Sequence, residues 1–414
     1  MNSILLSRKN FNPKSNLEIQ LSGSKSESNR VLIISELCSR EIEIHGISHS
    51  EDTKRLQEIL TKEQNNKIIE VGPAGTTLRF LLAYFFLIQK KVVLTGSVRM
   101  KERPIGILVD ALKSLGAKIK YSEKNGFPPI EPLDFTFTEK NEINLNAEIS
   151  SQFATALLLI SPSLPNGLRL NLEGKILSFP YIQMTIDTMR YFGIEIEIKG
   201  NQIEIKPQKY LSKPIIIEPD WSSLAYWYCL IALSRIEEIY FPGFRKESKQ
   251  GDQIIAKIME KLGVQTQFEE FGVRLIKTEV KTKFLEFNFS DCPDLAPTII
   301  ICCSGLQING IFSGLESLRI KECDRILALE IELEKFGVNF YQELTGNYLL
   351  KTENLILNQN VVINTYDDHR IAMAFAPMVF SQKSLEIKNP EVVKKSYPEF
   401  WNDLNKFGLE AEIS

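Results

Sequence analysis

Residues 21–30, Leu-Ser-Gly-Ser-Lys-Ser-Glu-Ser-Asn-Arg, have side chains suited to binding an anion. The alternating run 17–21 before them predicts a short strand, and the apolar run 31–37 after them predicts a buried helix. A helix start offers free N–H groups and the positive end of the helix dipole. Lys25 adds a point charge, and Arg30 adds a planar fork that suits phosphate or carboxylate. Taken alone, such a segment is more often a capped helix start with solvated charges.

Further segments share this pattern of polar or charged side chains at an expected helix start. Pro104 fits the first turn of one such helix, where its missing N–H does no harm. Lys321 and Arg325 are four residues apart and are expected on one helix face. The segments are 71–80 with Thr76, Thr77 and Arg79; 97–106 with Arg99, Lys101 and Arg103; 148–159 with Ser150, Ser151 and Gln152; 291–298 with Asp291 and Asp294; 318–337 with Arg319, Lys321, Glu322, Asp324 and Arg325; 365–376 with Asp367, Asp368, His369 and Arg370; and 392–400 with Lys394 and Lys395.

These helix starts come from both halves of the chain, which predicts a pair of polyanionic ligands held between two domains. Asp294 and Glu322 are carboxylates inside otherwise cationic segments. Neighbouring cations keep a carboxylate ionised, whereas a desolvated cleft raises its pKa. Both residues are therefore candidates for proton transfer.

Length and composition exclude several classes of protein. A chain of 414 residues exceeds the usual size of a single core, and its net charge of −3 lacks the basic field of a nucleic-acid binder. The six cysteines form no Cys-x-x-Cys pair, and the three histidines have no metal-ligand spacing. No secretory signal is expected, and the most apolar run, 80–88, is too short to span a membrane. We expect a cytoplasmic protein with reduced cysteines and no metal site.

An internal repeat organises the chain. Five helix patterns end in a glycine and lead into an alternating strand pattern, with the glycines 77, 70, 74 and 71 residues apart. At this period the chain holds six αβ units, of which the first, ending near Leu60, lacks its glycine. Two groups of three units predict two similar domains, and the run between Pro214 and Pro219 is a plausible crossover. The five glycines are Gly116, Gly193, Gly263, Gly337 and Gly408.

The ordered motifs resemble the EPSP synthase (3-phosphoshikimate 1-carboxyvinyltransferase) family. Residues 21–30 are similar to its Leu-Pro-Gly-Ser-Lys-Ser-x-Ser-Asn-Arg signature, and the segments at 99–106, 150–153, 293–298, 318–326, 365–373 and 394–400 resemble further family blocks. The resemblance implies an α/β (α+β) fold of two similar domains, each of three βαβαββ units, the inverse α/β barrel of the enolpyruvyl transferases. It places the first domain at 21–218, with its first unit shortened, the second at 1–20 plus 219–414, and the active site in the cleft between them.

The resemblance also implies transfer of the carboxyvinyl group of phosphoenolpyruvate to the 5-hydroxyl of shikimate 3-phosphate, through a tetrahedral intermediate and without metal or other cofactor. We expect a monomer with these two small-molecule substrates and no nucleic-acid or membrane partner. The implied catalytic residues are Asp294, Glu322 and Lys25. The implied phosphoenolpyruvate residues are Lys25, Gly75, Arg103, Gln152, Arg325, Arg370 and Lys395. Those implied for shikimate 3-phosphate are Ser26, Arg30, Ser150, Ser151, Gln152, Ser178, Tyr181, Asp294 and Lys321.

Two alternatives stay open. The UDP-N-acetylglucosamine enolpyruvyl transferases share the architecture and the donor, but they usually carry a cysteine in the cationic loop that corresponds to 97–106, where this chain has none. A non-catalytic, anion-binding relative is the other alternative, and the presence of both Asp294 and Glu322 argues against it.

Overall fold

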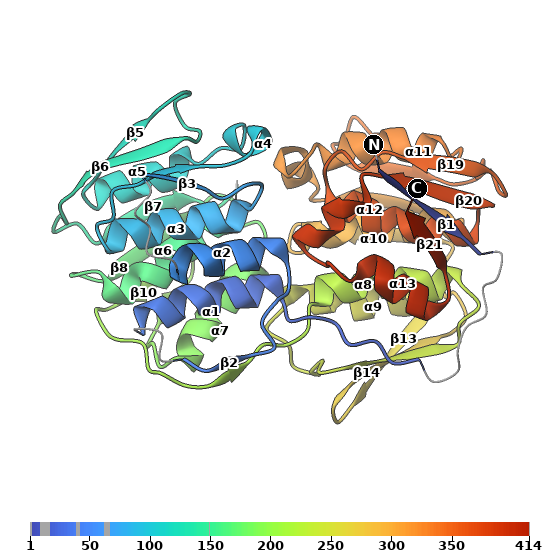
Figure 1. The fold of residues 1–414 in the computed structure, drawn as a ribbon, viewed down its shortest axis with the longest axis horizontal. Coiled ribbons are helices and arrows are strands. Elements are labelled where there is room, and N and C mark those ends of the chain that lie inside the picture. Colours follow the sequence, from blue (N-terminus) through green and yellow to red (C-terminus); the bar gives the residue numbers. More distant parts are fainter. Residues whose placement is uncertain (1, 9–16, 39–41, 62–66, 149, 414) are drawn as a thin grey trace. The chain divides into compact units, whose positions relative to one another are not determined.

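The computed structural model describes residues 2–8, 17–38, 42–61, 67–148 and 150–413 (Figure 1). The chain divides into two compact units, and each is described by itself. Unit 1 comprises residues 1–22 and 218–414, and unit 2 comprises residues 23–217.

Unit 2 alternates helices and short strands. Its helices are α1 (Lys25–Leu37), α2 (Glu51–Thr61), α3 (Gly75–Leu87), α4 (Val98–Lys101), α5 (Gly106–Ser114), α6 (Ser151–Ile160) and α7 (Phe179–Tyr191), with the 3-10 helix η1 (Ser161–Ser163). Its strands are β2 (Ile44–His45), β3 (Ile68–Glu70), β4 (Val93–Thr95), β5 (Ala117–Tyr121), β6 (Ile130–Phe135), β7 (Glu142–Asn146), β8 (Leu168–Glu173), β9 (Glu197–Lys199), β10 (Gln202–Ile205) and β11 (Ile215–Ile216).

Unit 1 follows the same alternation. Its α-helices are α8 (Trp221–Leu233), α9 (Ile255–Lys261), α10 (Ala296–Gly305), α11 (Arg325–Glu334), α12 (His369–Phe375) and α13 (Phe400–Phe407). Its 3-10 helices are η2 (Gly251–Ile254), η3 (Pro293–Leu295), η4 (Glu316–Ile320), η5 (Ala376–Phe380) and η6 (Pro390–Lys395). Its strands are β1 (Ser3–Ser7), β12 (Glu238–Pro242), β13 (Val264–Glu269), β14 (Gly272–Lys277), β15 (Phe284–Asn288), β16 (Asn309–Ser313), β17 (Asn339–Gln342), β18 (Tyr348–Lys351), β19 (Asn360–Ile363), β20 (Ser384–Lys388) and β21 (Glu410–Ile413).

One sheet pattern recurs in both units. Sheets β3-β4-β6-β5, β7-β8-β10-β9 and β15-β16-β18-β17 each pair their first two strands in parallel and the others antiparallel. Sheet β19-β20-β1-β21 has the same pattern, with β1 from the start of the chain in the third place. A parallel pair requires a crossover, which a helix supplies in each case. The predicted mixed α/β class is confirmed.

The segment before α1 belongs to unit 1, although α1 lies in unit 2. The segment before α8 belongs to unit 2, although α8 lies in unit 1. Residues 17–21, predicted as a strand, form only an isolated parallel bridge, Glu18 to Tyr240, with β12 of unit 1. Conversely β11, which leads toward α8, pairs in parallel with β2 of unit 2. At this bridge the N–H of Ile19 donates to the carbonyl oxygen of Tyr240, and the N–H of Tyr240 donates to the carbonyl oxygen of Leu17, both at 3.0 Å. The strand prediction for 17–21 was therefore wrong.

The five predicted cap glycines all have a positive φ, between +72° and +112°. Gly116 shows why the position needs glycine: a Cβ there would lie 1.7 Å from the carbonyl oxygen of Thr136. At Gly337 it would lie 2.2 Å from the carbonyl oxygen of Asn354. The chain therefore turns from helix to strand in a left-handed conformation that only glycine adopts without strain. The sequence prediction of these caps is confirmed.

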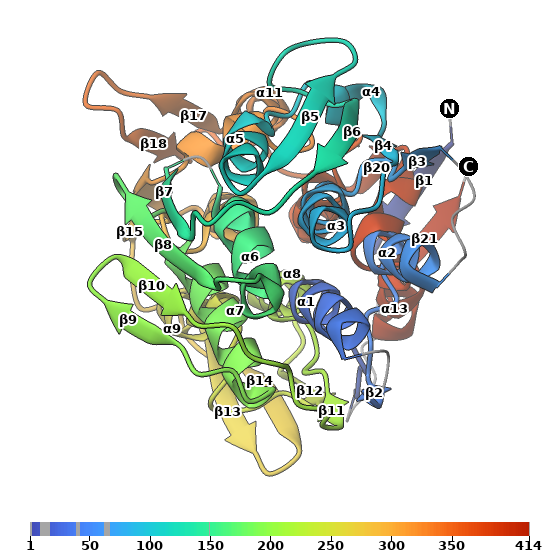
Figure 2. The ribbon, with the colours of Figure 1, turned by 90° about the vertical axis from the view of Figure 1, so that its left-hand side faces the viewer.

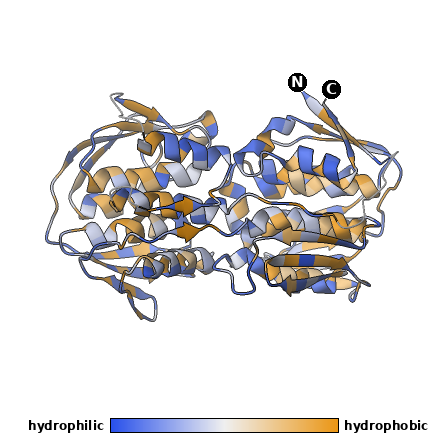
Figure 3. Cartoon of the chain, turned by 60° about the horizontal axis from the view of Figure 1, so that its bottom comes forward, coloured by the Kyte–Doolittle hydropathy of each residue, from blue (hydrophilic) through white to orange (hydrophobic). Residues whose placement is uncertain are grey.

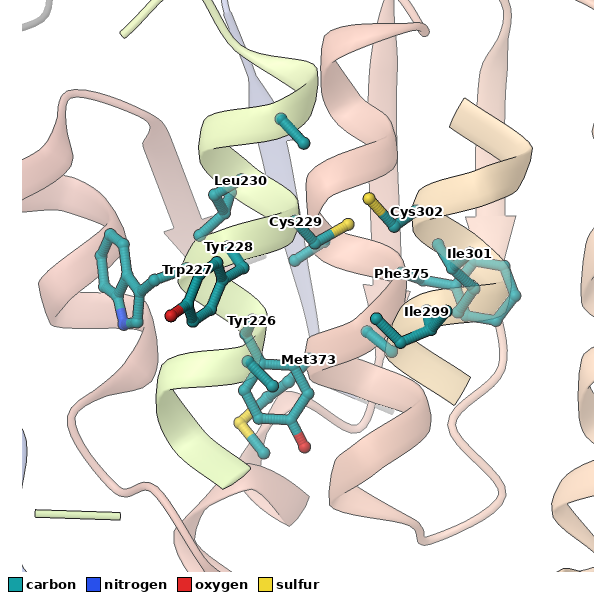
Figure 4. Close-up of a cluster of buried hydrophobic side chains, with 14 of the residues drawn as sticks. Tyr226, Trp227, Tyr228, Cys229, Leu230, Ile299, Ile301, Cys302, Met373 and Phe375 are labelled. Atoms are coloured by element: carbon teal, nitrogen blue, oxygen red, sulfur yellow. The ribbon is translucent and has the colours of Figure 1, made fainter. Parts of the chain in front are cut away.

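Three buried helices form the centre of each unit. In unit 2, α1, α3 and α6 contact one another, with the strands outside them (Figure 2). In unit 1, α8, α10 and α12 do the same, and side chains such as Tyr226, Ile299 and Met373 meet between them (Figure 4). Helices that are apolar all round are expected in a protein interior, and Figure 3 shows such apolar runs along the chain. All six cysteines are free thiols, and five of them are buried.

Candidate active site

The predicted site residues of unit 1 meet near the starts of α10, α11 and α12 and the ends of η4 and η6. Arg325, at the first position of α11, is 1% exposed and contacts three carboxylates. Its NH1 donates to Asp294 at 2.9 Å, its NH2 donates to Glu322 at 2.8 Å, and its Nε donates to Asp368 at 2.7 Å. A buried guanidinium needs such compensation, because an unpaired buried charge is very costly. Arg325 therefore fixes the mutual positions of the carboxylates.

Asp294 lies in η3, directly before α10, and is surrounded by cations. Its carboxylate is 3.3 Å from Lys321, 2.9 Å from Arg325 and 3.1 Å from Arg370. Burial pushes the pKa of Asp294 upward, but Arg370, Lys321 and Arg325 together lower this pKa well below its ordinary value. The sequence left open whether cations or desolvation would dominate, and for this residue the cations do. Asp294 is thus ionised and able to accept a proton.

Glu322 and Lys395 form a second ion pair in the same cluster. The ammonium of Lys395 at the end of η6 lies 3.0 Å from Glu322, and the Lys395 side chain is 7% exposed. Because Glu322 also contacts Arg325, the loop before α11 and the end of η6 are held together. Six predicted residues of unit 1 are therefore brought into one cluster: Asp294, Lys321, Glu322, Arg325, Arg370 and Lys395.

One prediction about this cluster was wrong. Lys321 does not share a helix face with Arg325, because Lys321 has an extended backbone at the end of η4 and α11 begins only at Arg325. Asp324 intervenes as the N-cap of α11 and accepts from the backbone N–H of Leu327. Both cations still point at one anion, which is the carboxylate of Asp294.

Asp368 is a member of the cluster that was absent from the predicted site. It is fully buried, contacts Arg325 through both oxygens, and caps α12 by accepting from the backbone N–H of Arg370 at 2.8 Å. Its neighbour Arg370 was predicted as a ligand, so the charged run before an apolar helix was the available signal. The side chain of Asp368 therefore holds the guanidinium of Arg325 by an ion pair and the backbone of Arg370 by a hydrogen bond.

In unit 2, the predicted residues also lie at helix starts. Arg30 on α1 is 4% exposed and donates to the carbonyl oxygens of Ser26 and Tyr181 at 2.7 and 2.9 Å, and to Thr185 at 2.8 Å. Burial lowers the pKa of Arg30 to about 10, against the opposing effects of Tyr181 and Glu27. The guanidinium thus ties the start of α1 to α7.

The start of α3 places two guanidinium groups beside Gly75. A Cβ at Gly75 would lie 2.6 Å from NH1 of Arg103 and 2.9 Å from NH1 of Arg79. Arg79 donates to the carbonyl oxygen of Gly75 at 2.8 Å and lies 5.4 Å from the ring centroid of Phe153 on α6. Arg103 is therefore close to the start of α3, as expected for an anion site.

The predicted place of Pro104 in the first turn of a helix was wrong. The N-cap of α5 is Ile105, so the proline precedes the helix. Arg99 and Lys101 do come before this helix, as predicted, and they lie in the separate short helix α4.

The remaining predicted residues of unit 2 occupy the starts of α1, α6 and α7. Ser150 is the N-cap of α6, accepting from the N–H of Gln152 at 3.2 Å, and Ser151 begins that helix. Ser178 is the N-cap of α7 with φ +57°, and its carbonyl oxygen accepts from the N–H of Tyr181 at 3.1 Å. At α1, the half-buried Lys25 lies 3.4 Å from Asp52 of α2.

Ser222 and Asp252 are two further polar residues near Arg370 that the sequence did not single out. Ser222 on α8 donates a hydrogen bond to Asp252 in η2, and Arg370 approaches Ser222 at 3.5 Å. Burial raises the pKa of Asp252 to about 6, even though Arg370 and Ser222 lower it. Charged residues do precede Asp252, at Arg245, Lys246, Glu247 and Lys249 before η2, but the sequence analysis did not select this segment.

In the part of the chain that the structure describes, no helix is both long and apolar enough to cross a membrane.

Solved structures with the same fold define the class of protein. EPSP synthase from Acinetobacter baumannii matches with a TM-score of 0.77 at 19% identity, covering 100% of both chains. The enolpyruvyl transferase NikO from Streptomyces tendae matches with a TM-score of 0.73 at 12% identity, covering 100% of this chain and 99% of that one. The fold is that of the enolpyruvyl transferases.

Sequence similarity specifies the family within this class. Residues 60–404 match the family EPSP synthase (3-phosphoshikimate 1-carboxyvinyltransferase). The 3-phosphoshikimate 1-carboxyvinyltransferase of Bacteroides fragilis strain YCH46 is 42% identical over 398 residues, 95% of this chain and 96% of that protein. The enzyme of the same name from Haemophilus influenzae strain PittGG is 32% identical, over 95% and 96% of the two chains. The chain belongs to the EPSP synthase family.

Proposed function

We propose that the helix-start clusters of the two units serve a single reaction. That reaction is carboxyvinyl transfer: the chain moves the carboxyvinyl group of phosphoenolpyruvate to the 5-hydroxyl of shikimate 3-phosphate and releases phosphate. The observation that supports this assignment of the clusters is the group of ion pairs in unit 1, in which four cations, Lys321, Arg325, Arg370 and Lys395, surround three carboxylates, Asp294, Glu322 and Asp368. Two phosphorylated carboxylates as substrates require such a concentration of positive charge.

The cations of both units would bind the substrates. For phosphoenolpyruvate we propose Lys25, Gly75, Arg103 and Gln152 from unit 2 and Arg325, Arg370 and Lys395 from unit 1. For shikimate 3-phosphate we propose Ser26, Arg30, Ser150, Ser151, Gln152, Ser178 and Tyr181 from unit 2 and Asp294 and Lys321 from unit 1. Arg30 would act chiefly by holding the carbonyl groups of Ser26 and Tyr181, because its guanidinium already donates to both.

The catalytic steps are assigned to Asp294, Glu322 and Lys25. Asp294 would accept the proton of the 5-hydroxyl while the hydroxyl oxygen bonds to the substituted vinyl carbon. Glu322, protonated when the substrates are bound, would donate its proton to the methylene carbon and take a proton back from the resulting methyl group. The resulting tetrahedral intermediate loses phosphate by cleavage of its carbon–oxygen bond and loses a methyl proton to restore the vinyl group. The lowered pKa of Asp294 keeps its carboxylate ionised before the substrate binds, as a proton acceptor must be, and it also makes the carboxylate a weaker base in the free protein.

Purified protein with phosphoenolpyruvate and shikimate 3-phosphate provides the test, with phosphate release as the measurement. Release that requires both substrates is expected. Release with UDP-N-acetylglucosamine in place of shikimate 3-phosphate, and none with the latter, would contradict the proposal. The monomeric state and the cytoplasmic location are proposed as well, and light scattering coupled to gel filtration measures the first.

A further inference from the structure

Arg370 of unit 1 is held from two sides by different groups. On one side, its NH2 donates to the Asp294 carboxylate at 3.1 Å and its NH1 donates to the Asp294 carbonyl oxygen at 3.3 Å. On the other side, NH2 approaches the hydroxyl oxygen of Ser222 at 3.5 Å. Ser222 in turn donates its proton to the carboxylate of Asp252, which is 3% exposed. A chain of polar contacts thus runs from Asp252 through Ser222 to Arg370.

We propose that Ser222 and Asp252 are positioning residues that fix the orientation of the Arg370 guanidinium for phosphoenolpyruvate. The proposal rests on the proposed function, in which Arg370 binds this substrate. Neither Ser222 nor Asp252 is among the residues that the resemblance implied.

The direction of the hydroxyl proton makes this chain of contacts specific. A serine hydroxyl has one proton to donate and two lone pairs that accept. Because Asp252 takes the proton of Ser222, the lone pairs remain for a donor, and Arg370 is the donor on that side. By accepting the hydroxyl proton, Asp252 leaves the lone pairs of the Ser222 oxygen to accept from Arg370.

The second contact matters because Asp294 cannot orient Arg370 alone while it also accepts a proton. When Asp294 is protonated, its hold on Arg370 weakens, since the ion pair between guanidinium and carboxylate is lost and only a hydrogen bond to a neutral group remains. The contact with Ser222 does not depend on the charge of Asp294. Ser222 would therefore keep the guanidinium in place through the step in which Asp294 changes its charge.

Three serine variants of the full-length protein test the proposal. Ser222→Ala removes the hydroxyl, Ser222→Thr restores it, and Ser223→Ala is a matched control that makes the same change one residue further along α8. For Ser222→Ala we expect the KM for phosphoenolpyruvate to rise about 5- to 10-fold, while kcat stays within about threefold and the KM for shikimate 3-phosphate is unchanged. Ser222→Thr and Ser223→Ala should resemble the unaltered protein.

Two aspartate variants test the other end of the chain of contacts. Asp252→Asn keeps an acceptor for the Ser222 proton and should leave the KM for phosphoenolpyruvate within about twofold. Asp252→Ala removes the acceptor and should raise this KM as Ser222→Ala does. A merely structural role would instead change both KM values, without rescue by Ser222→Thr or Asp252→Asn.

Calorimetric titration with inorganic phosphate separates this proposal from the proposed function. If the unaltered protein releases phosphate from both substrates but Ser222→Ala has an unchanged KM for phosphoenolpyruvate, the positioning role is wrong. If the unaltered protein is inactive, the proposed function is wrong. In that case weaker phosphate binding by Ser222→Ala than by Ser223→Ala would still support the positioning role, and equal binding would overturn it.

Discussion

Asp252 should make unit 1 less stable at neutral and alkaline pH, and Asp252→Asn should remove that cost. The carboxyl group is 3% exposed, and burial raises its pKa from 3.8 to about 6. Arg370 and the Ser222 hydroxyl favour the ionised form, but they do not outweigh burial, and Asp294 and Asp220 add repulsion. Asparagine has nearly the same shape and cannot ionise, so it isolates the cost of the charge.

The magnitude follows from the difference between the two pKa values. A rise from 3.8 to about 6 corresponds to about 3 kcal/mol of unfolding free energy once the carboxyl is ionised in both states. Between these pH values the folded protein keeps a proton that the unfolded chain has released, so stability falls as pH rises. Below pH 3.8 the carboxyl is protonated in both states and the cost is absent. Asp252→Asn should therefore gain up to about 3 kcal/mol at pH 8 and little at pH 4.

Tryptophan fluorescence is the appropriate assay, because all three tryptophans, Trp221, Trp227 and Trp401, lie in unit 1. For a unit of about this size, 3 kcal/mol corresponds to roughly 6–12 °C in the thermal midpoint. Asp403→Asn is a matched control, since Asp403 is 2% exposed but accepts from Tyr397 and Lys406, so its loss should destabilise at pH 8. An Asp252→Asn midpoint at pH 8 equal to or below that of the unaltered protein would refute the reasoning.

Three other substitutions address the remaining parts of the site. Glu322→Gln should lower kcat by about 10²- to 10⁴-fold while the affinity for shikimate 3-phosphate stays within about tenfold; loss of that affinity in a binding titration, with kcat unchanged, would make Glu322 a binding residue only. Gly75→Ala should raise the KM for phosphoenolpyruvate by about tenfold, because its Cβ would lie 2.6 Å from NH1 of Arg103; unchanged steady-state kinetics would show that Arg103 moves aside without consequence. Arg30→Lys should lower the unfolding free energy of unit 2 by about 2–4 kcal/mol, because an ammonium cannot reproduce the planar guanidinium that reaches the Tyr181 carbonyl oxygen. Hydrogen exchange of the α7 amides measures this change. Unchanged protection of these amides would leave Arg30 as a substrate ligand alone.

The repeating architecture could be predicted because its signals are local. Each cap glycine follows a helix pattern directly, and positions such as Gly116 and Gly337 have no room for a Cβ. The cluster around Arg325 could be predicted as a group of residues for a similar reason. Except for Lys395, which ends η6, its members stand at or just before helix starts, where charged side chains before an apolar run are visible in the sequence.

Other features depend on contacts between distant segments and leave no such signal. Residues 17–21 alternate like a strand, but they pair through a single bridge, from Glu18 to Tyr240, which is far away in the sequence. Asp252 reaches Ser222 because η2 packs against α8, a contact that the sequence does not reveal. A single carboxylate in a mixed segment does not reveal that it will be buried, and therefore its raised pKa could not be expected.

Exposure decides which of the clustered carboxylates can exchange protons with a substrate. Arg325 contacts three carboxylates, but their side chains are exposed to different extents: 0% for Asp368, 14% for Glu322 and 19% for Asp294. Asp368 is also committed to the backbone N–H of Arg370, so its oxygens are directed into the protein. Asp368 can position the arginines, but its carboxylate is not exposed to a substrate. Asp294 and Glu322 are partly exposed, so these are the carboxylates of the cluster that we propose for proton transfer.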